Sequence, residues 1–274
     1  TLPWRLHGGF TSKGGKEWPV NKITPHDVQV WAAGMDASAT VIIRAVSVLR
    51  GILDDAVARR ALAVNPAVDI TLPRKVPREH VYLTHTQVQA LATAAGWYRA
   101  VVYVACYCGL RWSEIVGMKV RDFEPDTRRL HVRRAVVQVG GQYHEGTPKS
   151  WERRTVSVPA FLARLLIQQA TGKSVDDLLF PSMRGGYMSR PQTARGWWRT
   201  ATRAAGVEGM RVHDMRATCA SLAVQAGASV KALQRMLGHR SAAMTLDTYS
   251  GLYADDLDDV AQRLDRAQSA LKTP

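Results

Sequence analysis

The stretch RVHDMRATCASLAVQA, residues 211–226, decides the fold of this chain. Its apolar residues recur at three- and four-residue steps, which is typical of an α-helix packed on a core. His213 and Arg216 are three residues apart and therefore project side by side from the edge of that face. The sequence thus predicts a helix that holds two hydrogen-bond donors at the rim of a core. The expected buried face consists of Val212, Met215, Cys219, Leu222 and Ala226.

The pair of His213 and Arg216 allows two interpretations. A lone histidine beside an apolar face is most often a satisfied core residue. A half-buried guanidinium, in contrast, needs an anionic partner, because burying an unpaired charge costs desolvation free energy. The arginine therefore shifts the balance toward an anion-binding role.

A short helix is expected at GLRWSEIVGM, residues 109–118. Arg111 stands at its start, where helix-terminal N–H groups add positive field. Its planar guanidinium suits a phosphate, since it donates two parallel hydrogen bonds. Glu114 lies on the same side of the helix and can orient a neighbouring cation. An isolated arginine in such a motif is more often an ordinary surface residue, so the motif gains weight from the other residues.

Three further residues complete the candidate set. His239 follows Gly238, which is a stop signal for a helix expected at 229–237. Tyr249 comes later in LDTYS, and its phenol becomes a good nucleophile when nearby Arg and His groups accept its proton or stabilise its anion. Lys149, in GTPKS between two strand-like segments, can protonate a leaving oxygen. The simpler alternatives are a helix end, an ordinary buried aromatic and a surface lysine.

Together these residues suit cleavage of a phosphodiester. That reaction needs cations at the non-bridging oxygens, an in-line nucleophile and a proton for the leaving oxygen. Metal-dependent cleavage is the competing route. The eight histidines, however, show neither HExxH nor paired His/Cys spacing, and the dense acidic group at 255–259 begins an expected helix. We therefore expect no metal and no other cofactor.

The composition and net charge limit the classes of protein to which this chain can belong. The chain has 274 residues, 46% of them hydrophobic, and a formal net charge of +14. This surplus of positive charge favours a polyanionic partner, since each neutralised phosphate releases counterions. The simpler alternative is that the positive charge serves only to keep the protein soluble. No apolar run approaches the roughly 18 residues of a membrane span, and we expect no signal peptide. The three cysteines, Cys106, Cys108 and Cys219, lack CxxC spacing and indicate buried thiols in a reducing compartment.

Two domains are expected, at 1–76 and 77–274. The first contains a helix at ITPHDVQVWAAGM, capped by Thr24, and a longer helix at about 38–62 whose buried face is Ile42, Ala45, Leu49, Ile52 and Ala56. The Pro-rich, basic stretch NPAVDITLPRKVPREH predicts an extended linker. In the second domain we expect a small antiparallel sheet within 119–158 and helices at 84–95, 98–108, 159–170, 190–205, 211–226, 229–237 and 255–271.

With these motifs assembled, the chain resembles the tyrosine recombinases of the phage integrase family. Its amino-acid sequence is similar to those of actinobacterial phage integrases. GLRWSE, TPKS, HDMR, LGH and LDTY occur in the family's order, and five such matches in order are very specific. The stretch from ITPHDVQVW to NPAVDITLP resembles the family's core-DNA-binding domain, and residues 80–260 resemble its catalytic domain. The resemblance implies a mainly α fold with a small antiparallel sheet, arranged as a two-domain C-shaped clamp.

The resemblance also assigns roles to individual residues. Arg111 and Arg216 would bind the scissile phosphate, while Lys149 would protonate the 5′-hydroxyl leaving group. Glu114 would hold the Arg/His set in place.

His213 would accept or share the proton of the tyrosine, and His239 would hydrogen-bond a phosphate oxygen. Tyr249 would form a 3′-phosphotyrosyl link, which the 5′-hydroxyl of a partner strand then attacks. The energy of the broken bond is conserved in that link, so the reaction implied is site-specific recombination without ATP or metal.

The implied partners are double-stranded DNA at attachment or core sites, other copies of the chain in a tetramer, and an accessory DNA-bending or directionality protein. No membrane is involved, and the implied location is the cytoplasm of a host bacterium, at the nucleoid. Because the chain begins at Thr1, we expect it either to lack an N-terminal arm-binding domain or to be truncated. The C-terminal helix at 255–271 is suited to docking on a neighbour or on its own domain, through Leu257, Val260, Leu264, Ala267 and Leu271.

Three interpretations of the function stay open. The favoured one is a site-specific recombinase. The others are a non-catalytic DNA-binding protein that keeps the fold, and a strand-relaxing enzyme similar to type IB topoisomerases.

Overall fold

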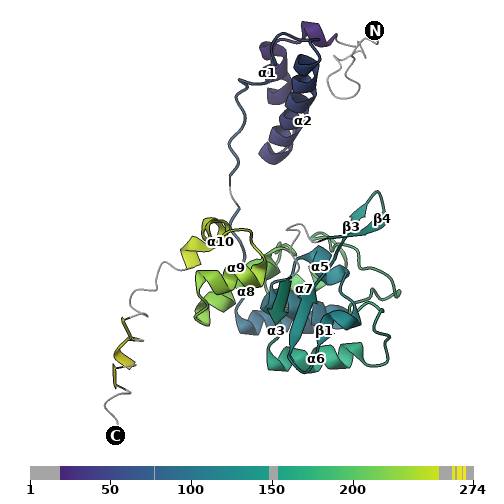
Figure 1. Ribbon diagram of the computed structural model, residues 1–274, viewed down its shortest axis with the longest axis vertical. Coiled ribbons are helices and arrows are strands. Elements are labelled where there is room, and N and C mark those ends of the chain that lie inside the picture. The colour runs from purple at the N-terminus through teal and green to yellow at the C-terminus, as the bar shows by residue number, and fades with distance from the viewer. Residues whose placement is uncertain are drawn as a thin grey trace. The chain divides into compact units, whose positions relative to one another are not determined.

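The chain divides into two compact units, which Figure 1 shows in the computed structural model. Unit 1 is Thr1–Glu79 and unit 2 is His80–Pro274, and each is described by itself. The division therefore lies between Glu79 and His80, whereas the sequence predicts it between 76 and 77. The structure describes residues 19–76, 78–147, 154–252, 261–262, 264–266 and 268–269.

The described part of unit 1, from residue 19 on, is built around the helices α1 and α2. Its helical elements are η1 (Val20–Lys22), α1 (Pro25–Ala33) and α2 (Ala39–Ala58). Thr24 caps α1 as predicted, because its hydroxyl accepts from the backbone N–H of Asp27 while the Asp27 carboxylate accepts from the N–H of Thr24. The main core of the unit consists of Val20, Ile23, Val28, Leu49, Leu53, Ala56 and Ala67.

The buried face of α2 is the predicted one in part, because Ile42, Leu49 and Ala56 are buried. The helix ends at Ala58 rather than near 62, and Ile52 is 43% exposed. Val46 and Leu53 are buried in its place. Two neighbouring rows of apolar residues run along this helix, and the packing partner decides which of them is covered.

The first part of the expected linker packs onto unit 1. Asn65 donates hydrogen bonds to the carbonyl of Arg50 at 3.0 Å and to the carboxylate of Asp54 at 2.6 Å. Arg50 in turn donates to the carbonyls of Ala67 and Val68. Ala67 is fully buried. Side-chain hydrogen bonds therefore hold the first residues of the predicted extended linker against α2, a contact that the linker composition did not predict.

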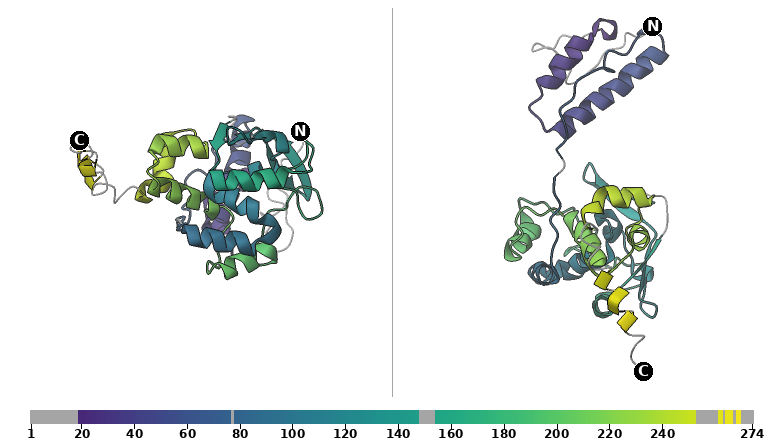
Figure 2. Two further views of the ribbon diagram at one scale, coloured as in Figure 1. Left: turned by 90° about the horizontal axis from the view of Figure 1, so that it is seen from below. Right: turned by 90° about the vertical axis from the view of Figure 1, so that its left-hand side faces the viewer.

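Unit 2 is mainly helical with small antiparallel sheets, so the predicted mainly α fold with antiparallel sheet is confirmed (Figure 2). None of the described helices is long and apolar enough to cross a membrane. The helical elements are α3 (His85–Ala94), η2 (Gly96–Tyr98), α4 (Arg99–Cys108), α5 (Trp112–Val116), η3 (Val120–Asp122), α6 (Ala160–Ala170), α7 (Gly196–Ala204), α8 (Asp214–Gln225), α9 (Val230–Leu237), α10 (Ala242–Tyr249) and η4 (Ser250–Leu252).

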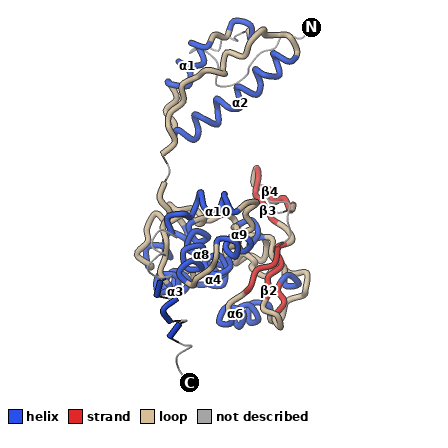
Figure 3. The backbone as a smooth tube through the Cα atoms, turned by 60° about the vertical axis from the view of Figure 1, so that its left-hand side comes forward, coloured by secondary structure: helices blue, strands red, loops and turns tan. Residues whose placement is uncertain are grey.

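Within the described residues, the strands form two small sheets where one was expected. They are β1 (Phe123–Glu124), β2 (Arg129–Val132), β3 (Ala135–Val139), β4 (Gln142–Gly146) and β5 (Arg154–Ser157). One sheet has the order β1-β2-β5 and the other pairs β3 with β4, all antiparallel. The strands gather on one side of unit 2, and the helices α3, α4, α8 and α10 lie on the other (Figure 3).

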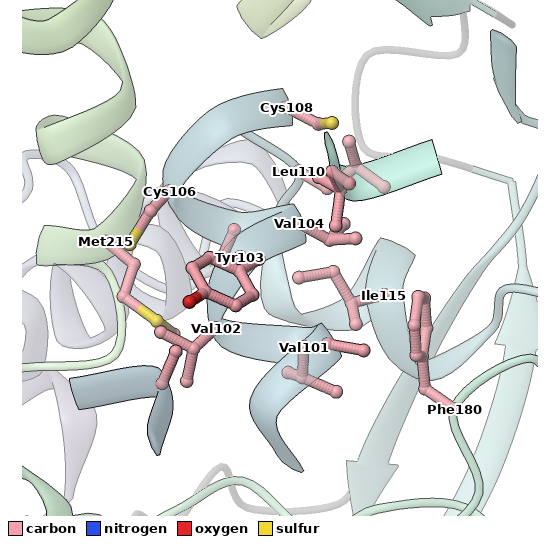
Figure 4. Packing of buried hydrophobic residues seen from close by; sticks show 14 of the residues in the cluster. Val101, Val102, Tyr103, Val104, Cys106, Cys108, Leu110, Ile115, Phe180 and Met215 are labelled. Carbon is pink, nitrogen blue, oxygen red and sulfur yellow. The ribbon is translucent and has the colours of Figure 1, made fainter. Parts of the chain in front are cut away.

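The core of unit 2 surrounds α4. This helix is apolar on all sides, and Val102, Val104, Cys106 and Cys108 are fully buried. Figure 4 shows the side chains of α4 packed among neighbours that come from α5, α8 and the loop that carries Phe180. All three cysteines are free and buried, as predicted.

The helix α8 is also buried on nearly every side. Its interior residues include Asp214, Arg216 and Thr218 as well as the expected apolar ones. Ala226 belongs to the predicted buried face, but it is the exposed C-cap residue of the helix. The polar residues are tolerated inside because each of these three has hydrogen-bond partners.

Two further helices differ from the sequence prediction, and a third lies largely outside the described residues. The helix expected at 190–205 begins only at Gly196, and the short helix α10, capped by the side chain of Ser241, was not predicted. The expected C-terminal helix at 255–271 lies largely outside the described residues, although Leu264 of its apolar stripe is 67% exposed.

Gly109, which ends α4, should not tolerate a side chain. Its φ is +64°, and an added Cβ would lie 2.7 Å from Cδ2 of Leu237 and 3.1 Å from Sγ of Cys219. We expect Gly109→Ala to lower the free energy of unfolding by about 2–4 kcal/mol, because backbone strain and overpacking add. Urea unfolding followed by circular dichroism measures this change.

Gly172→Ala is the matched control. Gly172 also has a positive φ, of +76°, but an added Cβ there meets nothing within 4 Å. In Gly172→Ala, backbone strain alone should lower the free energy of unfolding by about 1 kcal/mol. Equal losses in the two variants would show that the clash at Gly109 contributes nothing.

Candidate active site

Arg216 lies inside unit 2, with 3% of its surface exposed. Its guanidinium donates to the carbonyls of Gly109 and Leu237, which stand at the ends of α4 and α9. Burial, helped by the nearby Arg111 and Arg154, lowers the pKa of Arg216 to about 10, so the group stays protonated at neutral pH. The predicted position at the rim of the core is therefore wrong. The negative C-terminal ends of α4 and α9 stabilise the guanidinium charge, so Arg216 is buried inside the core and not at its rim.

Arg111 is the N-cap residue of α5 and is held by Glu114. The Glu114 carboxylate accepts the backbone N–H of Arg111 at 2.8 Å and its Nη1 at 3.0 Å. Nη2 of Arg111 donates to the carbonyl of Gly238 at 3.3 Å. The Arg111 side chain is 24% exposed, whereas Glu114 is 1% exposed. The guanidinium is thus fixed by a buried carboxylate and still reaches solvent.

Glu114 stays ionised although it is buried. Burial raises the pKa of this carboxyl, but the hydrogen bonds and charges of Arg154 and Arg111 outweigh that effect and hold the pKa below its ordinary value.

His213 stands at the N-cap of α8, beside a second imidazole, that of His80. The two ring centroids are 6.3 Å apart. Nδ1 of His80 lies 3.0 Å from the carboxylate of Asp214, which is almost fully buried. Burial lowers the pKa of His213, and the charge of Arg216 lowers it further. His213 is therefore neutral at pH 7 and able to accept a proton.

His239 and Tyr249 stack against each other. Their rings are nearly parallel, at 4°, with centroids 6.2 Å apart. Nδ1 of His239 lies 3.0 Å from the hydroxyl of the fully buried Thr245, which fixes the ring. Burial, together with the charges of Arg216 and Arg111, lowers the pKa of His239 to about 4. The imidazole is therefore neutral at neutral pH.

Tyr249 is the last residue of α10 and is 2% exposed. It belongs to a small apolar cluster with residues of α8 and α9. Burial raises the pKa of its phenol, and the cations Arg216 and Arg111 offset only part of that rise. The phenol is protonated at neutral pH, so its activation requires a proton acceptor.

The structure therefore brings most of the predicted set together. The residues that converge on the junction of α4, α8, α9 and α10 are Arg111, Glu114, His213, Arg216, His239 and Tyr249. Lys149 lies outside the described residues.

Sequence reasoning missed three residues of this region. Arg154 bonds to Glu114, and the ring centroid of His80 lies 6.4 Å from that of Tyr249. Asp214 stands within the HDMR motif but was given no role, although it pairs with His80 from 134 residues away in the chain. No local pattern links positions so far apart.

A basic pocket of about 400 Å³ opens beside His239. The residues that line it are Arg154, Thr155, Lys231, Gln234, Arg235, Gly238, His239 and Arg240. Such a concentration of cations is suited to an anion, and a phosphate group has the matching charge and hydrogen-bond acceptors.

Comparison with known proteins identifies the family. Residues 81–255 match the model of the phage integrase family. The chain is also 30% identical over 259 residues to the integrase of Mycobacterium phage D29, across 90% of this chain and 68% of that protein. The chain belongs to the phage integrase family. Its members are tyrosine recombinases, an enzyme class that breaks and rejoins DNA, and the chain is 24% identical over 239 residues to tyrosine recombinase XerD of Rickettsia conorii, across 81% of this chain and 78% of that protein.

This integrase-family chain shares its fold with solved structures of distant relatives. The Tn1549 transposon integrase in complex with a circular intermediate DNA has a TM-score of 0.76 and 19% identity, across 94% of this chain and 90% of that one. The lambda integrase dimer bound to a COC′ core site has a TM-score of 0.64 and 20% identity, across 86% of this chain and 67% of that one. At these identities the likeness shows the fold.

His239 should make the protein sensitive to acid. Its pKa is about 4 in the folded chain and 6.5 ordinarily, so between these pH values the unfolded chain binds more protons. The free energy of unfolding should therefore fall as the pH is lowered from 6.5 to 4, and it should fall less steeply in His239→Gln. Urea unfolding at a series of pH values measures both slopes. His144→Gln, at an exposed residue of β4, should follow the wild type. Parallel slopes for wild type and His239→Gln would contradict the expectation.

Proposed function

We propose that this chain is a site-specific DNA recombinase that cuts and rejoins strands through a 3′-phosphotyrosyl link on Tyr249. The observation that carries the proposal is the placement of Tyr249 against His239, within the electrostatic influence of Arg216 and Arg111. A nucleophile beside fixed cations and neutral imidazoles is the arrangement that attack on a phosphodiester needs. The integrase relatives support the same reaction.

In the first step, the phenolic oxygen of Tyr249 attacks the scissile phosphorus. The Tyr–O–P bond forms as the bond from phosphorus to the 5′ oxygen breaks. Arg111 and Arg216 stabilise the charge that develops on the non-bridging oxygens, and His239 donates a hydrogen bond to one of them. Arg216 suits this task because its position is fixed before the substrate arrives.

Two protons must move during this step. His213 accepts the proton of the Tyr249 phenol, which its lowered pKa permits, since the neutral imidazole is the form that has a free lone pair. Lys149, outside the described residues, supplies a proton to the 5′ oxygen. In the second step, the 5′-hydroxyl of a partner strand attacks the phosphotyrosine and releases Tyr249, so bond energy is conserved and ATP is not needed.

The proposed substrate is duplex DNA that carries attachment or core sites. The net charge of +14 and the basic pocket beside His239 favour a polyanion. In this proposal unit 1 is the core-type DNA-binding domain, and unit 2 is the catalytic domain. Recombination of two duplexes needs several active sites, so we propose that copies of the chain assemble on DNA as a tetramer, with an accessory DNA-bending or directionality protein as a further partner.

Trapping of a covalent complex tests the chemistry. A nicked duplex that contains the attachment site loses its short 5′-hydroxyl fragment after cleavage, so the protein–DNA link accumulates and is seen on denaturing gels. We expect wild type to form this adduct and Tyr249→Phe to form none, because the variant lacks the nucleophile. Tyr98→Phe, at a partly buried tyrosine stacked on Trp197, is the matched control and should react like wild type. An adduct in Tyr249→Phe would refute the assignment.

A second assay separates the alternatives. Two duplexes with different end labels yield recombinant products with a recombinase, whereas a strand-relaxing enzyme only changes the supercoiling of a plasmid. A protein that merely binds DNA gives neither result and traps no adduct.

DNA affinity should depend steeply on salt. Each phosphate contact adds a slope of about −0.9 to the plot of log K against log[salt], because bound counterions are released. Fluorescence anisotropy with a labelled duplex over a range of NaCl concentrations measures this slope. A flat profile would contradict binding to the phosphate backbone.

A further inference from the structure

A second guanidinium, that of Arg154, shares the carboxylate of Glu114 with Arg111. Nη1 of Arg154 donates to Oε1 of Glu114 at 2.8 Å, and Nη2 donates to Oε2 at 2.7 Å. The Arg154 side chain is 9% exposed and that of Glu114 is 1% exposed. This is the bidentate geometry, with two parallel hydrogen bonds, in which arginine binds carboxylate most strongly. Because the pair is buried, removal of Glu114 would leave the charge of Arg154 uncompensated.

The single charge of Glu114 is divided between two cations. Arg154 occupies both carboxylate oxygens, and Arg111 adds its backbone N–H to one and its Nη1 to the other. These four hydrogen bonds use about all the lone-pair sites of a carboxylate. Since Arg154 already neutralises Glu114, the positive charge of Arg111 is left for another anion. Without Arg154, Glu114 would pair with Arg111 alone and cancel its charge.

Arg154 also lies against the turn that carries His239. Its Nε donates to the carbonyl of Met236 at 3.3 Å. A Cβ at Gly238 would lie 2.8 Å from Cδ of Arg154 and 3.0 Å from its Nε, so side chain and backbone are in direct contact. The carbonyl of Gly238 in turn accepts Nη2 of Arg111. Arg154 therefore connects the start of β5 with the end of α9.

We propose that Arg154 is a positioning residue for the scissile phosphate. It neutralises Glu114, so that Arg111 keeps its charge for the phosphate, and it supports the turn at Gly238 that presents His239. Arg154 acts through these neighbours, and no direct contact with the reacting atoms is required. The inference rests on the proposed function, because it takes Arg111 as a ligand of the phosphate.

The test compares two substrates with Arg154→Gln. One is the nicked duplex described above, and the other carries a neutral methylphosphonate at the scissile position. On the ordinary phosphate, we expect the single-turnover rate of adduct formation at saturating DNA to fall about 100-fold. On the methylphosphonate, wild type and variant should differ less than about threefold, since a neutral phosphoryl group depends less on the charge of Arg111.

The two substrates distinguish positioning of charge from a structural role. If Arg154 merely maintained the fold, Arg154→Gln would slow both reactions by the same factor, and this result would overturn the proposal. Unfolding midpoints of all variants are measured in parallel.

Two variants complete the experiment. Arg154→Lys keeps the charge but loses the bidentate geometry, so we expect the rate of adduct formation on the ordinary phosphate to fall about tenfold. If Arg154→Gln does not fold, Arg154→Lys takes its place in the comparison of the two substrates. Arg203→Gln breaks an exposed pair with Glu208, whose atoms are 2.6 Å apart, and should stay within about twofold of wild type.

The failures of the two proposals can be told apart. If wild type forms no adduct, the proposed function fails. If wild type forms the adduct and Arg154→Gln forms it equally fast, only the role of Arg154 is refuted.

Discussion

The buried guanidinium of Arg216 is the constraint on which the rest of the site depends. Burying an isolated cation is costly, and here its hydrogen bonds go to the carbonyls of Gly109 and Leu237. These carbonyls stand at the ends of α4 and α9, where the helix dipole is negative. One side chain on α8 therefore fixes how three helices meet. Arg111 reinforces the junction, because it bonds to the carbonyl of the next residue, Gly238.

An excess of positive charge follows from this arrangement and sets the protonation of its neighbours. Arg111 and Arg154 share the carboxylate of Glu114, while Arg216 has only carbonyl partners among the hydrogen bonds described. The resulting field adds to burial in lowering the pKa of both His213 and His239. Cations with carbonyl partners, beside neutral imidazoles, favour binding of an anion, in agreement with the phosphate-binding role proposed for Arg111 and Arg216.

Much of the local structure followed from the sequence, and the errors have a common cause. The cap at Thr24 was predicted because a capping side chain acts within three residues. The predicted buried face of α2 was wrong at Ile52, since Ile52 and Leu53 are equally apolar and only the opposing surface decides which of them is covered. The helix α10 was missed because it is short, with 8 residues, and lacks a clear apolar period.

The sequence by itself determined the residue types of the site, their order, the helical character of the chain and the family resemblance, because motifs and periodicity are local. Only the tertiary structure showed that Arg216 is buried rather than at a rim, that His80 lies beside Tyr249, and that Arg154 completes the environment of Glu114. The physical reason is that burial and hydrogen bonding depend on which distant segments pack together. His80 and Asp214, which are 134 positions apart, become neighbours only when unit 2 folds.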